Sequence, residues 1–241
     1  LALEATGTID APRTWNGTLS LQLSDVHRRE INFDRALIQI SAEQGHAVLR
    51  SADIIEEMNE FHLRGSMEMP STFADFGRTP ANLEISGTAP DLERLTAGTA
   101  VALTGSAEFS GKIDIVDANV QATLGVTASR LGFREGIINK LTSTLRASKR
   151  IARGDTKRPW FADLRTATEF NLTDIRYRDY IFDSAEGSFN SSDDVFGLDR
   201  FDLRRKQNEL TVRGRYLLPA EVSRFTSQPA QVEIALNAAD A

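Results

Sequence analysis

The residue types that most often do chemistry are sparse in this chain. It has three histidines and no cysteine, which excludes a disulfide scaffold and a thiolate metal site. The histidines, His27, His46 and His62, have no neighbouring ligand at the spacing of a metal site. There is no phosphate-binding loop, no dinucleotide fingerprint and no nucleophile elbow. We therefore expect no enzymatic activity, no bound metal and no cofactor.

Carboxylates offer another route to acid/base chemistry. Three aspartates recur at a separation of 149 residues, giving the pairs Asp25/Asp174, Asp34/Asp183 and Asp53/Asp202. Because they repeat, we expect them to cap turns or to pair with Arg29 and Arg178, which repeat at the same offset. The acidic stretch 190–194 could hold a calcium ion but lacks the spacing of a calcium loop, and a hairpin turn is the alternative.

The same offset relates two long segments. Residues 18–91 and 167–240 align without a gap and share 20 of 74 positions. A weaker, divergent copy occupies about 92–166 and contains a basic insert at 134–158. We interpret 1–241 as a single elongated β-repeat segment and, because it starts in mid-pattern, as a fragment of a longer chain. In a repeat array, function is expected in the surface that the repeats build together.

Apolar and polar residues alternate along most of the chain, which predicts strands with one apolar and one polar face. Charged residues such as Arg64, Glu84, Arg213 and Glu233 mark the polar face. The apolar face is predicted to comprise Leu19, Leu21, Leu23, Phe33, Phe61, Leu63, Met67, Met69, Leu83, Ile85, Val101, Leu103, Phe109, Ile113, Ile115, Val120, Leu124, Val126, Phe170, Leu172, Phe182, Leu210, Val212, Val232 and Ile234.

The pattern predicts an all-β fold with at most one short helix: a long, curled, antiparallel-rich sheet that forms an elongated trough. About twenty strands of ~10–12 residues can be drawn, which at ~4.8 Å per strand would make a sheet about 95 Å long. Glycines within the strands, Gly7, Gly65, Gly105 and Gly214, predict bulges, bends or a close backbone approach, unless they are simply tolerated in a twisted strand.

Residues 136–154 break the alternation. Ile137, Leu141 and Leu145 lie at helical spacing among basic residues, which predicts an amphipathic helix that could lie on an anionic membrane. The alternatives are a helix that crosses over the sheet with a solvated basic face, or a further strand. The chain as a whole has a net charge of −6, which argues against a nucleic-acid binder. No apolar run reaches the length of a membrane span.

A motif of the form N-E-(aliphatic or Phe)-x-(aliphatic)-R-G occurs at 59–65 and again at 208–214, after a strand beginning with Asp and before a proline. This repeat pattern extends over most of the chain and resembles the repeat unit of the AsmA-like superfamily. Residues 201–219 most resemble its TamB-type members, the bridge-like lipid transfer proteins of diderm bacteria. The resemblance implies a β-sheet trough with an apolar concave lining. It also implies a periplasmic location within an inner-membrane-anchored envelope protein that carries phospholipids to the outer membrane in outer-membrane biogenesis. An inner-membrane anchor and an outer-membrane barrel of the assembly-factor class would be engaged through regions outside this segment.

Three functions from different classes remain open on the residues alone. The first is a lipid conduit whose groove shields acyl chains. The second is a structural or adhesive β-repeat protein with a closed apolar core and no lipid. The third, a glycan-acting β-helix enzyme, is disfavoured because no pair of carboxylates stands apart from the repeat.

Overall fold

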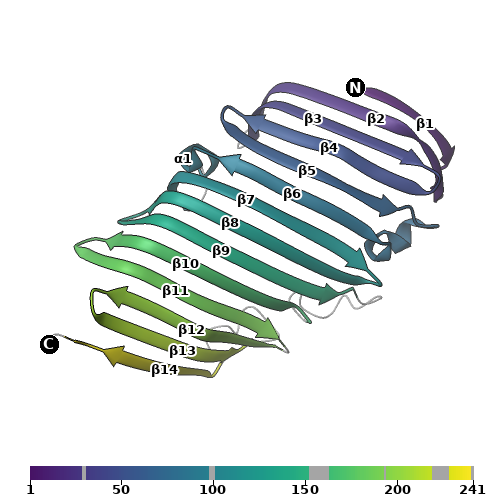
Figure 1. The fold of residues 1–241 in the computed structure, drawn as a ribbon. Helices are drawn as coiled ribbons and strands as arrows, with labels where there is room; N and C mark the ends of the chain where they lie inside the picture. Colours follow the sequence, from purple (N-terminus) through teal and green to yellow (C-terminus); the bar gives the residue numbers. More distant parts are fainter. Residues whose placement is uncertain (29–30, 98–100, 152–162, 193, 219–227, 240–241) are drawn as a thin grey trace.

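The computed structural model describes residues 1–28, 31–97, 101–151, 163–192, 194–218 and 228–239. Within them the chain forms one antiparallel sheet of 14 strands, and the order of the strands in space is their order in the sequence. The sheet is open, with β1 at one edge, β14 at the other and the two chain ends far apart (Figure 1). The predicted all-β class with a long antiparallel sheet is confirmed.

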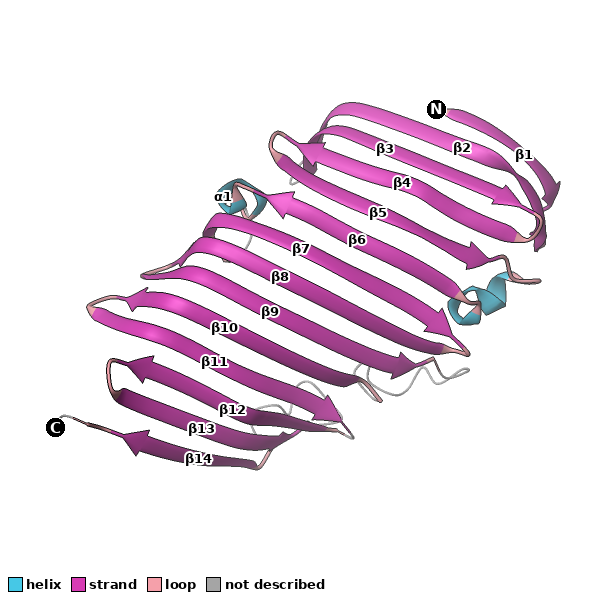
Figure 2. Ribbon diagram, in the orientation of Figure 1, coloured by secondary structure: helices cyan, strands magenta, loops and turns pink. Residues whose placement is uncertain are grey.

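Most of the described chain is strand (Figure 2). The strands are β1 (Ala2–Thr8), β2 (Ala11–Arg28), β3 (Ile31–Glu43), β4 (His46–Glu56), β5 (Asn59–Glu68), β6 (Ala81–Ala89), β7 (Leu103–Val116), β8 (Asn119–Phe133), β9 (Gly136–Arg150), β10 (Arg165–Tyr177), β11 (Tyr180–Ser192), β12 (Val195–Arg205), β13 (Asn208–Leu217) and β14 (Ala230–Asn237). Two short helical turns, η1 (Phe73–Arg78) and α1 (Leu92–Leu95), lie in the connections on either side of β6.

The strands are fewer and longer than the alternation predicted. The described residues form 14 strands instead of about twenty, and β2 alone spans 18 residues. At ~4.8 Å per strand the sheet extends about 62 Å and not about 95 Å. The error has a local cause. Asp25, Arg130 and Asp174 adopt positive φ inside strands, so the polar interruptions there are bends within a strand and not turns between two.

The segment predicted as a basic amphipathic helix is the strand β9, which pairs with β8 and β10 along its length. Of the interpretations left open for this segment, the further strand is confirmed and the two helical ones are wrong. The helical pattern arose because a spacing of four residues is also a multiple of two. Leu141 and Leu145 therefore share a face in a strand as well as in a helix. The rest of that segment, 152–154, lies outside the described residues.

The two long copies have the same strand plan. Strands β3, β4, β5 and β6 begin at residues 31, 46, 59 and 81, and β11, β12, β13 and β14 begin 149 residues later, at 180, 195, 208 and 230. The pairing register breaks between Leu49 and Ala52 in the first copy and at the equivalent positions, Leu198 and Phe201, in the second. Among its described residues the middle region contributes β7, β8 and β9, which fits its weak similarity to the five-strand copies.

The repeated aspartates have structural roles. The Asp34 carboxylate accepts a hydrogen bond from the backbone N–H of Glu57 at 2.5 Å, and Asp183 accepts the same bond from Lys206 at 2.5 Å. Asp25 and Asp174 share a φ of 52° and mark a bend in equivalent strands. The expectation that these residues serve turns is confirmed for Asp34 and Asp183. Arg178 pairs with Glu135 and not with a repeated aspartate, and Arg29 lies outside the described residues.

The four strand glycines also differ in role. Gly7 and Gly105 have φ of 140° and 103°, and each lies where the register of its strand shifts, as in a β-bulge. Gly65 and Gly214 mark close approaches, since an added Cβ would lie 2.3 Å and 3.1 Å from the carbonyl oxygens of Asn82 and Gln231. The prediction of bulges and close approaches is therefore confirmed at these positions.

In the described residues the sheet is a single layer. The solvent-accessible surface is 16365 Å², whereas a compact protein of this mass would expose about 10,700 Å². Few side chains are fully buried, and the central cluster of Ile138, Ile175 and Ala185 packs on one face of β9, β10 and β11. The fold thus leaves most of both sheet faces accessible.

Candidate functional site

One face of the sheet is apolar from β1 to β14. In each strand the apolar residues alternate, and the pairing register places them opposite one another: Leu63 opposite Ile85, Ile113 opposite Ala122, and Val212 opposite Ile234. At the internal bends the alternation shifts, yet Leu172, Ile175 and Phe182 still pack into one cluster. The bends therefore keep the apolar side chains on a single face, which we call the apolar face.

The residues predicted for the apolar face lie there, with two exceptions. Val101 precedes β7 and is exposed outside the strands, so it adds nothing to this face. Met69 follows β5 directly and is buried at the end of that strand, where its N–H donates to the Gly45 carbonyl at 2.7 Å. All other predicted residues are strand residues, as given by the bounds above.

Sequence reasoning missed other members of this face. They share the alternation of their neighbours, and they include Ile38, Ile40, Leu49, Leu141, Leu145, Leu203 and Leu236. The signal that could have found them was the repeat itself, since Leu49 and Leu198 are equivalent and identical. β9 has no counterpart in the repeat alignment, so its leucines lacked this guide.

Two phenylalanine pairs close over glycines in the middle of the apolar face. The rings of Phe61 and Phe109 come from β5 and β7 and meet with centroids 6.0 Å apart above β6, where Gly87 lies opposite both. The rings of Phe170 and Phe201 meet at 6.2 Å in the same way above Gly187 of β11. Strands two apart are separated by about 9.6 Å, so each pair leans inward across the strand between them.

The pairing register connects these two pairs in a single row that crosses the strands. From β5 to β13 this row reads Phe61, Gly87, Phe109, Val126, Ser143, Phe170, Gly187, Phe201, Val212. We call it the phenylalanine row. Glycine is needed at position 87 because an added Cβ would lie 2.6 Å from the Phe109 ring.

Hydroxyl groups occur on the apolar face of β9 to β11, and most are satisfied internally. Ser143 Oγ donates to the backbone carbonyl of Glu169 at 3.1 Å, and Thr166 and Ser191 share a hydrogen bond of 2.9 Å. Thr168 Oγ1 is buried and has no hydrogen-bond partner among the described residues. The described part of this face therefore presents few polar groups that could fix the position of a ligand.

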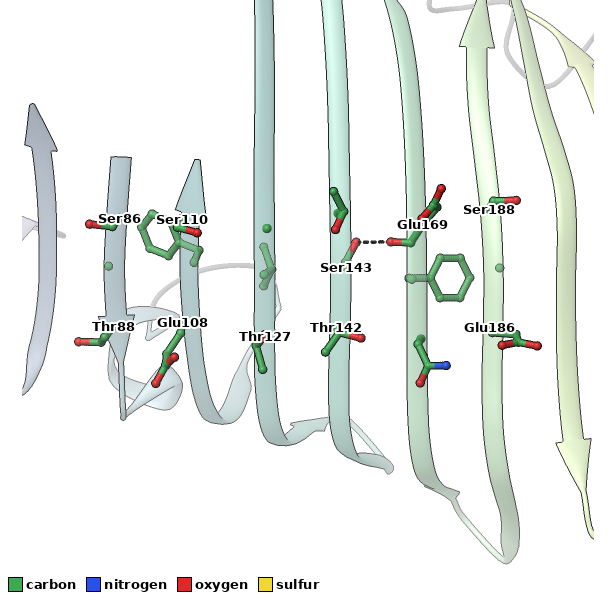
Figure 3. A pocket seen from close by; sticks show the side chains of 18 of the residues that line it. Ser86, Thr88, Glu108, Ser110, Thr127, Thr142, Ser143, Glu169, Glu186 and Ser188 are labelled. Carbon is green, nitrogen blue, oxygen red and sulfur yellow. Dashed lines mark hydrogen bonds between the residues drawn. The ribbon is translucent and has the colours of Figure 1, made fainter. Parts of the chain in front are cut away.

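The opposite face is polar and carries a shallow furrow of about 840 Å³. The furrow runs across the strands from β5 to β12, between two rows of polar side chains that include Ser110 and Thr127 (Figure 3). In this view Ser86 and Thr88 at one end point away from Glu186 and Ser188 at the other. Side chains that diverge in this way are expected on the outer side of a curved sheet, which places the apolar face on the inner side.

Ionisable side chains on the polar face pair with one another. His62 Nδ1 lies 2.8 Å from Asp53 Oδ1, and its Nε2 lies 3.5 Å from a carboxylate oxygen of Glu60. The hydrogen bond with His62 is the main cause that lowers the pKa of Asp53, against the opposing effect of burial. In the second copy Thr211 replaces His62 and donates to Asp202 at 2.7 Å, while Arg200 pairs with the other carboxylate oxygen.

The contact between His62 and Asp53 was not predicted, because the pairing of β4 with β5 brings together residues nine positions apart. The imidazole is half-exposed and lies between two carboxylates, and the same position in the second copy holds a threonine. This arrangement supports a structural role in cross-strand pairing. Among the described residues no group of three or more potential ligands could hold a metal ion. Of the acidic stretch 190–194, residue 193 lies outside the described residues. β11 ends at Ser192 and pairs with β12 from Val195, as the hairpin alternative required.

The fold and its faces thus define an open, single-layer antiparallel β-sheet protein with one apolar side. No family model, no curated protein and no solved structure matches this chain. In the described part of the chain, no helix is both long and apolar enough to cross a membrane.

Proposed function

We propose that the chain is a segment of a lipid conduit, in which the apolar face shields phospholipid acyl chains as they pass between two membranes. The observation that carries this proposal is the apolar face itself, which runs over all 14 strands and is covered by no second layer in the described residues. The resemblance of the repeat motif to AsmA-like and TamB-type proteins adds the setting. It favours the periplasm of a diderm bacterium, transport between the inner and outer membranes, and a membrane anchor and barrel partner engaged elsewhere.

The size of the apolar face supports a ligand-binding role. Strands averaging about twelve residues, at ~4.8 Å spacing, make a face of roughly 60 by 40 Å, or about 2,500 Å². The largest apolar patch on a typical soluble monomer is only about 300–600 Å². A face several times larger is expected to be covered in the working protein, and a chain of mobile lipids would cover it along its length.

The chemistry of the face suits acyl chains. Burial of one methylene group is worth about 0.8 kcal/mol, so a sixteen-carbon chain lying on the face would gain on the order of 10 kcal/mol before losses. The residues available for contact are aliphatic and aromatic, with few free polar groups among those described. Such a surface holds a chain without fixing its position, and this allows movement along the sheet.

A matched pair of variants in β8 tests the proposal. Leu124 lies on the apolar face opposite Gly111 and Leu145, whereas Thr123 lies next to it on the polar face, opposite Lys112 and Arg146. Leu124→Asp should remove co-purified phospholipid, measured by native mass spectrometry. Thr123→Asp, which places its new charge between two cations, should retain it.

Circular dichroism and chemical unfolding of both variants separate loss of lipid from loss of fold. A folded Leu124→Asp protein that still carries lipid, or a wild-type protein that neither retains nor takes up phospholipid, would refute the conduit. The second result would favour the alternative, a structural or adhesive β-repeat whose apolar face is covered by other protein.

A further inference from the structure

Two neighbouring hairpins end side by side at one end of the sheet. The β8–β9 connection and the β10–β11 connection both lie at the end of the strands opposite η1 (Figure 1). They are tied to each other, because the backbone N–H of Arg178 donates to the Glu135 carbonyl at 3.2 Å and the two side chains form an ion pair. We call residues 130–137 and 176–181 the double tip.

The double tip exposes large apolar side chains on both sides of the sheet. Ile137 and Ile181 are 52% and 56% exposed and flank Arg176 in one cross-strand row. Tyr177 and Tyr180 are opposite each other, 42% and 55% exposed, and Tyr180 stacks on Phe182 of the apolar face. Exposure on both sides fits a tip that enters its target edge-on better than one that lies flat on a single surface.

The charge of the double tip differs in sign from that of the whole chain. Its four arginines, Arg130, Arg134, Arg176 and Arg178, outnumber Glu135 and Asp179, which gives a net charge of +2 on a chain of net charge −6. The Arg178 guanidinium lies 5.4 Å from the Tyr177 ring centroid. Tyrosines with arginines beside them are typical of the boundary between lipid headgroups and acyl chains, where the ring is half apolar and the cation reaches phosphate.

The first copy shows that the sheet does not require these residues. The positions equivalent to Arg176, Tyr177, Tyr180 and Ile181 hold His27, Arg28, Ile31 and Asn32, and the same two strands pair there in the same register. The tyrosines and Ile181 are therefore particular to the second copy, and the pairing of these two strands does not require them.

We propose that the double tip docks on the surface of an anionic lipid bilayer. Tyr177, Tyr180, Ile137 and Ile181 enter the headgroup region, and Arg130, Arg134 and Arg176 pair with lipid phosphates. This inference goes beyond the proposed conduit, because binding at the tip does not require lipid on the apolar face. Each basic residue near an anionic surface strengthens binding about fivefold. Screening over a Debye length of ~10 Å at 0.1 M salt makes that contribution salt-dependent.

The test is co-sedimentation of the full chain with two kinds of vesicle, one of phosphatidylcholine alone and one that also contains roughly a third of the anionic lipid phosphatidylglycerol. We expect binding only to the anionic vesicles, weakening as salt is raised. The double variant Arg176→His and Ile181→Asn installs the first-copy residues, so the hairpin should still fold. Its affinity for the anionic vesicles should fall by about tenfold or more. Arg146→His, in the middle of the polar face, changes the same residue type and should bind as wild type.

The outcomes separate this inference from the conduit. Leu124→Asp should lose co-purified lipid yet bind anionic vesicles normally. Equal binding to both vesicle types, or unchanged binding by the Arg176→His and Ile181→Asn variant, would overturn the docking proposal whatever the lipid content. Absence of vesicle binding would also overturn it and assign the double tip to contact with another protein.

Discussion

The glycines beneath the phenylalanine pairs allow a sharp test of how the apolar face is packed. Gly87→Ala would place a Cβ 2.6 and 2.7 Å from two atoms of the Phe109 ring and 2.8 Å from the Glu60 carbonyl oxygen. All three distances are well inside van der Waals contact, so the ring must swing away from Phe61 or the strands must separate.

The expected cost follows from opposing effects. Overpacking of this kind costs about 1–3 kcal/mol, and loss of the ring pair adds about 0.5–1.5 kcal/mol. Replacing glycine in an extended strand returns about 0.4–1 kcal/mol by restricting the unfolded chain. The net expectation is a destabilisation of roughly 1–3 kcal/mol.

Gly125 in β8 provides the control. It lies on the polar face, and an added Cβ would meet only the Ser110 carbonyl oxygen at 3.8 Å, an ordinary contact. Gly125→Ala should therefore be neutral or stabilising by about 0.4–1 kcal/mol. Unfolding in urea, followed by circular dichroism, measures both free energies. Equal stability of Gly87→Ala and Gly125→Ala would refute the packing of rings over Gly87. Adding Phe109→Leu to Gly87→Ala should restore part of the loss if the ring is the cause.

Three further expectations concern the polar face, the turns and the overall shape. Hydrogen bonding to His62 lowers the pKa of Asp53 below its ordinary value of 3.8, so this pair stabilises the fold above about pH 3.8 and the contribution disappears as the pH falls through the lower folded-state pKa. Asp53→Asn should therefore flatten the acid side of a curve of stability against pH. An unchanged acid side would contradict this expectation. Asp34→Ala and Asp183→Ala each remove the acceptor of one turn N–H, and each should lower the free energy of unfolding by about 1 kcal/mol. Very unequal losses of stability in urea unfolding would show that the two copies are equivalent in geometry only. Small-angle X-ray scattering should give a radius of gyration of about 22 Å for a sheet of roughly 60 by 40 Å, and a value near 18 Å, that of a compact globule of this length, would mean that the sheet folds onto itself.

The faces of the sheet could be predicted from sequence, while the number of strands could not. Alternation with period two placed Leu63, Val126 and Val212 on one face without knowledge of their neighbours, because parity depends only on the local chain. Strand ends depend on whether a polar interruption is a turn or a bend. Asp174 and Asp183 look alike in sequence, yet one bends a strand at positive φ and the other caps a turn.

Contacts across strands were the other limit. The phenylalanine row and the pair of His62 with Asp53 depend on register, which is set by turns and bulges that the sequence marks only weakly. Repetition supplied part of this information. It identified Asp34 and Asp183 as equivalent before their shared role was visible, but it gave no help for β9, which lies between the two copies.

The purely sequential order of the strands has a mechanical consequence. In the described sheet each strand is paired only with the strands before and after it in the chain. Few of the described hydrogen bonds connect more distant parts, such as those of Arg13 with Pro70 and of Arg78 with Ile151. A force pulling the two termini apart would be opposed mainly by one ladder of interstrand hydrogen bonds at a time. The sheet would then unfold in hairpin-sized steps from its edges inward. A structure built in this way can lose an outer hairpin under tension and re-form it while the remaining strands stay assembled.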